Sequence, residues 1–253
     1  MNNFQVFVTR VVEKIAYELS CFLVETASEG IIISGPFAGM SYPRSRLVSY
    51  CPKALGTYEL ELAEIIELLC SFRFELIVNV GAAEGYYAVG MALRNSQARV
   101  IAFEANSVVQ KQLRKTIQAN NLASRIDVRG WCDSESLSHS LVPGNCCLVI
   151  MDIEGAENTL LDPVTVPYLQ HAYILVEIHD FVSKEIGASL LRRFEKSHKV
   201  IEIESRPRTK QDFLNSIVNR RISMIIPEYL ISTSMKEGRP EIMRWFYFEP
   251  LSY

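Results

Sequence analysis

Carboxylate and imidazole side chains stand at the ends of two apolar segments in the middle of the chain. Asp152 and Glu154 close the segment 146–153, and Glu177 and His179 close the next one. Residues two apart share one face of a strand, so the two members of each pair point the same way. Acids seldom occupy apolar strands without a partner or a function. Because carboxylate and imidazole groups carry acid–base chemistry, the cluster favours a functional site, with Asp152, Glu154 and His179 as its catalytic candidates. Glu177 is predicted to contact the substrate.

A loop with two glycines follows an earlier apolar run, in the order Asn79-Val80-Gly81-Ala82-Ala83-Glu84-Gly85. Glycines between a strand and a helix let the backbone approach a ligand, and the first amides of the helix point at that ligand. The dinucleotide pattern Gly-x-Gly-x-x-Gly fails here, because Ala83 and Tyr86 stand where its second and third glycines would be. The loop therefore favours a nucleoside ligand without a diphosphate.

An acid ends the next apolar run, 99–103. Glu104 follows Gly81 at about the 20-residue spacing at which an acid accepts hydrogen bonds from ribose hydroxyls. A solvated acid at a strand end is the alternative. The glycine loop and Glu104, on consecutive strands, together favour a ribose-binding site.

Apolar runs alternate with helical patterns from residue 75 onward. Such alternation predicts a parallel sheet with helices on both faces. The aromatic run Met243–Phe248 has no helix after it and is expected to insert antiparallel. Since the carboxyl ends of parallel strands meet at one edge of a sheet, the residues above should gather there. The expected strands are 76–80, 99–103, 126–129, 146–153, 172–178 and 199–203, and the expected helices are 85–95, 106–120 and 183–196.

Residues 1–56 are expected to form an N-terminal helix and a cap. Apolar residues at spacings of three and four predict an amphipathic helix near 4–25, which packs on its own domain or makes a homodimer. Glycines and prolines crowd 26–56, where Ile31–Ile33 is one short predicted strand. The second domain, 57–253, is then expected to begin with a helix capped by Thr57.

These segments together resemble the FkbM-type methyltransferases, which are class I enzymes that use S-adenosylmethionine. The resemblance rests on Val-Gly-Ala-Ala-Glu-Gly-Tyr-Tyr, on the strand end Phe-Glu, on Met-Asp-Ile-Glu-Gly-Ala-Glu and on Leu-Val-Glu-Ile-His, within about residues 55–248. It implies a Rossmann-like α/β fold with a seven-stranded, mostly parallel sheet whose last strand is antiparallel.

The resemblance also implies where S-adenosylmethionine binds. The methionine part would lie against the glycine loop, the ribose on Glu104, and the adenine near Trp131, Cys132 and Asp133. Asn79 stands where the superfamily usually has an acid, which weakens the charge of the site. The implied cofactor-binding residues are Asn79, Gly81, Ala83, Glu84, Gly85, Glu104, Cys132, Asp133 and Asp152.

The implied reaction is O-methylation of a hydroxyl on a small molecule or sugar. His179 is the expected base, because its ordinary pKa leaves it near-neutral at pH 7. The structural alternative makes Asp152 a helix cap and His179 a buried spacer. A divalent metal is compatible with these side chains, but their spacing does not favour one. Tyr42, Tyr58 and Glu59 flank the cap and are predicted to line the acceptor side.

The charge, hydropathy and cysteine content of the chain disfavour several other classes of protein. A formal net charge of −3 over 253 residues disfavours general nucleic-acid binding. The sequence shows no apolar run long enough to cross a bilayer and no secretory signal. Its cysteines form no Cys-x-x-Cys pair, and we expect them to be free thiols in a reducing cytoplasm. Two alternatives remain open: a non-catalytic Rossmann-like binding protein, if Asn79 marks a degenerate site, and a nicotinamide-dependent oxidoreductase, which the glycine pattern opposes. Arg206, Arg208, Arg220 and Arg221 are expected to form a solvated basic face or to contact an anionic acceptor.

Overall fold

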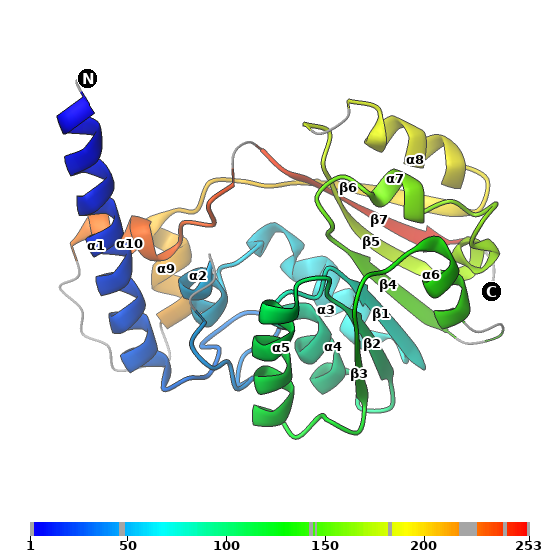
Figure 1. Ribbon diagram of the computed structural model, residues 1–253, viewed down its shortest axis with the longest axis horizontal. Coiled ribbons are helices and arrows are strands. Elements are labelled where there is room, and N and C mark those ends of the chain that lie inside the picture. Colours follow the sequence, from blue (N-terminus) through cyan, green and yellow to red (C-terminus); the bar gives the residue numbers. More distant parts are fainter. Residues whose placement is uncertain are drawn as a thin grey trace. The chain divides into compact units, whose positions relative to one another are not determined.

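The computed structural model describes residues 3–45, 49–141, 144, 146–181, 184–217, 227–239 and 242–251. The chain divides into two compact units (Figure 1). The first consists of Met1–Leu60 and Arg206–Pro240, and the second of Glu61–Ser205 and Glu241–Tyr253. Residues 206–240 were predicted to belong to the second domain, whereas the described part of this range, 206–217 and 227–239, groups with the N-terminal segment.

The second unit is built on a seven-stranded sheet in the order β3-β2-β1-β4-β5-β7-β6. Neighbouring strands are parallel except around β7, which runs antiparallel to both β5 and β6. The predicted fold class is therefore confirmed. The strands are β1 Leu76–Val80, β2 Arg99–Phe103, β3 Ile126–Arg129, β4 Cys147–Met151, β5 Tyr173–Ile178, β6 His198–Glu204 and β7 Arg244–Pro250.

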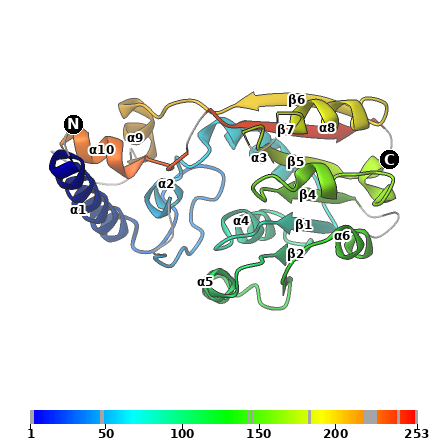
Figure 2. The same cartoon turned by 45° about the horizontal axis from the view of Figure 1, so that its top comes forward.

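Three helices cover one face of this sheet: α6 (Ser134–Ser140), α7 (Glu157–Leu160) and α8 (Ile186–Phe194) (Figure 2). Their apolar side chains join alternate residues of the strands in one hydrophobic cluster. Phe246 and Phe248 of β7 are fully buried in that cluster, where Phe194 contacts Phe248.

Three further helices lie on the opposite side: α3 (Ala63–Ser71), α4 (Tyr86–Arg94) and α5 (Ser107–Ala119). Trp245 and Tyr247 point to this face, since side chains alternate along a strand. The ring centroids of Tyr87 and Trp245 are 6.1 Å apart, and those of Tyr173 and Tyr247 are 6.5 Å apart. The aromatic run that the sequence assigned to a last strand thus supplies core residues to both faces.

Most sheet and helix boundaries agree with the sequence, but two local predictions are wrong. The helix expected from Thr57 begins only at Ala63, after a short 3-10 helix. Glu59 is in the left-handed region (φ 45°), which no α-helix accommodates. Ile31–Ile33 is not a strand, because only Ile31 pairs, in an isolated bridge with Ser41.

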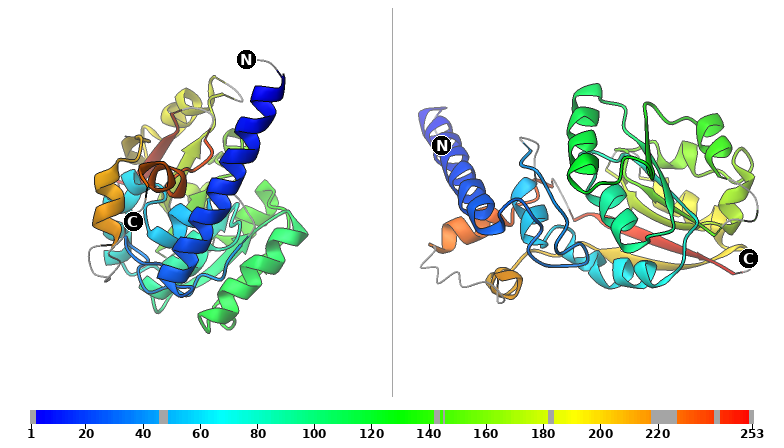
Figure 3. Two further views of the ribbon diagram at one scale, coloured as in Figure 1. Left: turned by 90° about the vertical axis from the view of Figure 1, so that its left-hand side faces the viewer. Right: turned by 90° about the horizontal axis from the view of Figure 1, so that it is seen from below.

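The first unit contains α1 (Asn3–Ser28), α2 (Tyr50–Leu55), α9 (Lys210–Ile217) and α10 (Glu228–Ser234). Helix α1 packs against α2 and α10 (Figure 3). The predicted helix is confirmed, and it buries Ala16, Cys21 and Val24. The apolar residues whose spacing predicted it do not form the buried face, since Ile15, Leu19 and Phe22 are 62%, 46% and 58% exposed. Homodimer formation through this helix stays a prediction. None of the helices in the described part of the chain combines the length and hydropathy that crossing a bilayer requires.

Buried ion pairs join the two segments of the first unit. Glu59 pairs with Arg239, and its backbone N–H donates to the carboxylate of Glu237 (3.1 Å). Glu237 also pairs with Arg239 (2.9 Å) and Arg208 (2.7 Å). Arg208 donates to the carbonyl of Thr57 as well (2.8 Å). The charges of these four side chains therefore stabilise one another in the interior of the unit.

This network corrects the prediction of a solvated basic face for Arg208, whose side chain is only 6% exposed. Arg206 is exposed and forms a two-bond pair with Asp212 (2.9 Å each). Arg220 and Arg221 lie outside the described residues.

Replacing Glu59 by alanine should destabilise the first unit by roughly 3 kcal/mol, because Arg239 would keep its charge with one fewer buried partner. Glu13→Ala, an exposed acid of α1, is the matched control and should change stability by no more than about 0.5 kcal/mol. Urea unfolding followed by circular dichroism measures both. Equal midpoints for the two variants would contradict a stabilising role for the network.

Candidate functional site

Four segments of the second unit converge at one edge of the sheet. The register pairs Val80 of β1 with Phe103 of β2 and Met151 of β4. The residues that follow these three strands, Gly81, Glu104 and Asp152, therefore start side by side. Strand β5 lies beside β4 and ends next to His179. The structure thus brings together the residues that the sequence placed at the carboxyl ends of the strands.

The glycine loop is held tightly against β2 and β4. Gly81 has φ 81°, and a Cβ there would lie 1.8 Å from the carbonyl oxygen of Asp152. The N–H groups of Gly81 and Ala82 donate to the carbonyl of Phe103 (3.0 and 2.9 Å). Gly85 precedes α4 with φ 95°, and a Cβ there would meet Leu113 at 2.7 Å. Both glycines are thus required by the close packing of the loop.

Glu104 connects the glycine loop to the start of α5. One carboxylate oxygen accepts the N–H of Ala83 (3.0 Å) and the other accepts the N–H of Asn106 (2.7 Å). Asn106 in turn caps α5, as its side chain accepts the N–H of Val108 (2.9 Å). Each carboxylate oxygen can accept a second hydrogen bond, so Glu104 retains capacity for a ligand's hydroxyl groups.

Asn79 is buried in the sheet, and its amide has a structural role. Its Nδ2 donates to the carbonyl of Ile150 (3.3 Å), while its Oδ1 has no partner among the described residues. An aspartate at this position would bring a carboxylate against that carbonyl oxygen. The presence of asparagine at position 79, where class I methyltransferases usually have an acid, therefore has a local physical reason. Glu84 of the loop is also buried.

The residues expected near the adenine have different environments. Cys132 is buried, and burial raises the pKa of its thiol to about 12. Asp133 caps α6 by accepting the N–H of Ser136 (2.8 Å), and the hydrogen bonds from Ser136 lower its pKa. Trp131 leaves 73% of its surface exposed. An adenine contact at these residues stays a prediction.

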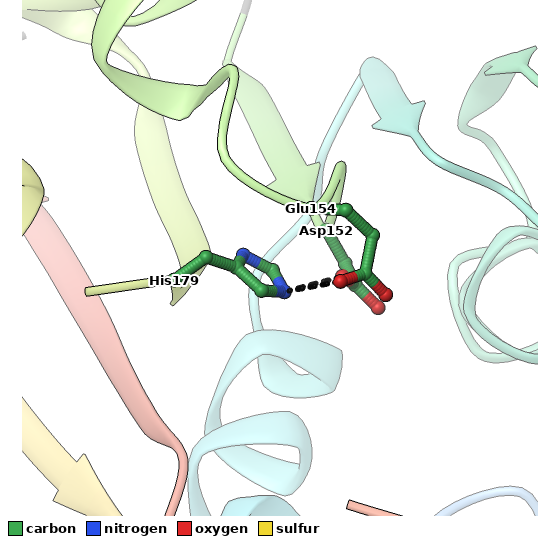
Figure 4. A group of neighbouring side chains, drawn as sticks. All are labelled: Asp152, Glu154 and His179. Atoms are coloured by element: carbon green, nitrogen blue, oxygen red, sulfur yellow. Dashed lines mark ion pairs between the residues drawn. The ribbon is translucent and has the colours of Figure 1, made fainter. Parts of the chain in front are cut away.

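The second half of the site is a cluster around the His179 imidazole (Figure 4). Nε2 of His179 lies 3.5 Å from a carboxylate oxygen of Asp152, of Glu154 and of Glu177. His179 is 1% exposed, whereas the side chains of Asp152 and Glu154 are 31% and 80% exposed. The cluster therefore has a buried base and an open, acidic side.

Glu157 completes this cluster, although no role was predicted for it from the sequence. It begins α7 and is fully buried, and its Oε1 lies 2.7 Å from Nδ1 of His179. The same oxygen accepts N–H groups of Gly155 (3.1 Å) and Ile153 (3.4 Å). In the sequence, Glu157 is the last acid of the motif Asp-Ile-Glu-Gly-Ala-Glu. Its partner His179 follows a different strand, so the motif alone did not indicate their contact.

The carboxylates change the acid–base properties of His179. Burial disfavours the imidazolium, but the hydrogen bond to Glu157 and the charges of Glu157, Asp152 and Glu154 outweigh it. The pKa of His179 is therefore raised above its ordinary value. A raised pKa lowers the fraction of His179 that is in the neutral, proton-accepting form at a given pH, which weakens the expectation that it acts alone as the base.

The other predicted acceptor residues belong to the first unit. Tyr42 is buried and stacks on Tyr50 with ring centroids 5.9 Å apart. The Lys53 amine lies over the Tyr58 ring, 4.6 Å from its centroid. Glu59 takes part in the buried ion pairs described above. Their predicted place beside the acceptor stays a prediction, and Glu177 is the substrate candidate that lies within the cluster.

No model of a known protein family matches the chain, and no curated protein matches it. Similar solved structures do exist, at low identity. The O-methyltransferase TomG from Streptomyces achromogenes, in complex with SAM, is 14% identical over 59% of this chain and 74% of its own, with a TM-score of 0.45. A human methyltransferase 10 domain containing protein is 14% identical over 93% of this chain and 96% of its own, with a TM-score of 0.48.

Methyltransferase FkbM from Methylobacillus flagellatus KT is 15% identical, with a TM-score of 0.48. The match covers 74% of this chain and 47% of that protein. All three structural neighbours are methyltransferases, and TomG is in complex with SAM; the more specific FkbM-type assignment of this chain stays a resemblance of motifs.

Gly81→Ala should destabilise the second unit by roughly 3 kcal/mol, because alanine is strained at this positive φ and its Cβ would meet the Asp152 carbonyl. Gly130→Ala is the matched control, since a Cβ there meets nothing within 4 Å and its φ is ordinary. Thermal unfolding of both variants checks the expectation. A Gly81 variant as stable as the Gly130 variant would show that the loop is not packed as described.

Proposed function

We propose that the protein transfers the methyl group of S-adenosylmethionine to a hydroxyl of a small molecule or sugar. The observation that carries this proposal is that the glycine loop lies between the Glu104 carboxylate on one side and the Asp152 segment on the other. On one side the loop is bonded to Glu104 through the Ala83 N–H, and on the other it lies against Asp152 at Gly81. A nucleoside and a reacting hydroxyl could therefore both be held at one loop.

The cofactor side fits a nucleoside better than a dinucleotide. Glu104 can accept further hydrogen bonds from the two ribose hydroxyls, as argued above. Tyr86 stands at the first position of α4, where the dinucleotide pattern has its third glycine, and it is buried. In the dinucleotide pattern the third glycine lets the helix pack closely on the strand, and a tyrosine side chain at that position does not allow the same packing. This supports S-adenosylmethionine over a nicotinamide cofactor.

The acceptor side supplies groups that can orient a hydroxyl. In the proposed reaction the acceptor oxygen attacks the methyl carbon, the bond from that carbon to sulfur breaks, and S-adenosylhomocysteine leaves. The hydroxyl proton must be removed, so an acceptor for it is needed near the oxygen. Asp152 is partly exposed at the edge of the cluster and is suited to hold that hydroxyl.

The alternative of a non-catalytic binding protein depended on Asn79 as a sign that the cofactor site is degenerate. The hydrogen bond from Asn79 to the Ile150 carbonyl gives the amide a structural reason. Asn79 therefore does not favour this alternative over methyl transfer.

The first test is binding of S-adenosylmethionine, measured by titration calorimetry. Glu104→Ala should weaken binding by roughly 1.5–3 kcal/mol, because two ribose hydroxyls would lose a charged acceptor. Glu195→Ala, an exposed acid at the end of α8, should bind as the unaltered protein does. Unchanged affinity in the Glu104 variant, with a melting temperature equal to that of the control, would refute the ribose assignment.

The second test separates chemistry from binding. Incubation with methyl-labelled S-adenosylmethionine and a metabolite extract, followed by mass spectrometry, identifies an acceptor. Asp152→Asn should then lower turnover by roughly 10²–10⁴-fold, since the acceptor hydroxyl loses its charged partner. Its affinity for S-adenosylmethionine should change little.

Glu195→Gln removes one exposed carboxylate charge away from the cluster and serves as the control, with unaltered turnover. Full activity of the Asp152 variant would remove this residue from the mechanism. Equal loss of activity and cofactor binding would assign it a structural role instead.

A further inference from the structure

We propose that Asp152, Glu154 and His179 bind a divalent cation. One ligand atom from each of these side chains lies within 4.8 Å of the other two. The side chains come from two neighbouring strand ends, and Figure 4 shows them pointing toward one another. The inference extends the proposed function, because the cation would lie at the acceptor side of the glycine loop.

The distances in the cluster fit a shared ion better than direct hydrogen bonds. Nε2 of His179 is 3.5 Å from both Asp152 and Glu154, which is long for a hydrogen bond. Two ligands that each lie about 2.1 Å from a metal, at a tetrahedral angle, are about 3.4 Å apart. Glu177, also 3.5 Å from Nε2, is close enough to serve as a further ligand or to orient one.

His179 is held in the orientation that a metal ligand needs. Its Nδ1 is bonded to the buried Glu157 carboxylate, so Nε2 faces the acids. Metal-binding histidines commonly have a carboxylate on the second ring nitrogen, which fixes the tautomer and the ring plane. Glu157 is itself anchored by the N–H groups of Gly155 and Ile153. Because His179 and Glu157 are both buried, their contact is an observation independent of the exposed acids Asp152 and Glu154.

The negative charges of the carboxylates in the cluster also favour binding of a cation. Asp152, Glu154 and Glu157 form no ion pair with an arginine or lysine among the described residues, and His179 is their shared partner. Like charges at this separation repel one another. A divalent cation on the open side would offset that repulsion.

The donor set indicates the class of ion and its use. One imidazole nitrogen with carboxylate oxygens suits Mn²⁺, Zn²⁺ or Fe²⁺ better than Ca²⁺. Because the Glu154 and Asp152 side chains are partly in solvent, the remaining positions on the ion would be open to water or to an acceptor hydroxyl. A bound cation lowers the pKa of such a hydroxyl. His179 would then be a ligand, and the hydroxyl proton could pass to solvent.

The experiment is calorimetric titration of the full chain with Mn²⁺, after treatment with a chelator and removal of that chelator. We expect one saturable site per chain. Asp152→Asn and Glu154→Gln should each weaken Mn²⁺ binding at least about 10-fold, whereas Glu195→Gln, the exposed control that directly follows α8, should bind normally. Glu154 is the more informative position, since its side chain is 80% exposed and its replacement has no buried packing to disturb.

Titrations with Zn²⁺ and Mg²⁺ complete the test. Lack of saturable binding of all three ions at millimolar concentration would overturn the proposal, as would binding that both variants leave unchanged. Titration with S-adenosylmethionine in the absence of metal keeps the two hypotheses separate. Cofactor binding without metal binding refutes the metal site alone, and metal binding without cofactor binding refutes the methyltransferase alone.

Discussion

The approach of the Gly81 backbone to the Asp152 backbone is the constraint on which the site depends. Strands β1 and β4 pair in parallel, and the pairing continues one residue further, because the Asp152 N–H donates to the Val80 carbonyl (3.0 Å). A side chain at residue 81 would separate the two segments. The nucleoside loop and the acidic cluster are therefore parts of one backbone arrangement, and their spacing is set by the sheet.

The sequence revealed the sheet well because buried parallel strands are short continuous apolar runs. The bounds of β1, β2 and β3 agree with the predicted runs, and Asn106 caps α5 at the predicted start. These features depend on local periodicity and on one capping side chain. The gathering of Glu104, Asp152 and His179 also followed from sequence, since strand ends in a parallel sheet share an edge.

Features that depend on distant partners were not predictable in this way. Thr57 resembled a helix cap, but its carbonyl accepts from Arg208 and the chain turns at Glu59 before α3 begins. Glu157 resembled any acid in the first turn of a helix until His179 was placed beside it. Helices α9 and α10 were not predicted, because they have only eight and seven residues, too few to show a clear period, and their packing partners α1 and α2 are distant in sequence.

The order of the segments along the chain has a consequence for synthesis. The first unit is made of two pieces, and all of Glu61–Ser205 lies between them in sequence. While the chain grows, α1 and Glu59 must wait for α10, Arg208 and Arg239, and the side of α1 that packs on α10 stays uncovered until then. Strand β6 likewise has no neighbour in the sheet before β7 has been made, because β7 lies between β5 and β6. Nascent chains that stop before residue 206 therefore have neither unit complete and expose surfaces that chaperones recognise.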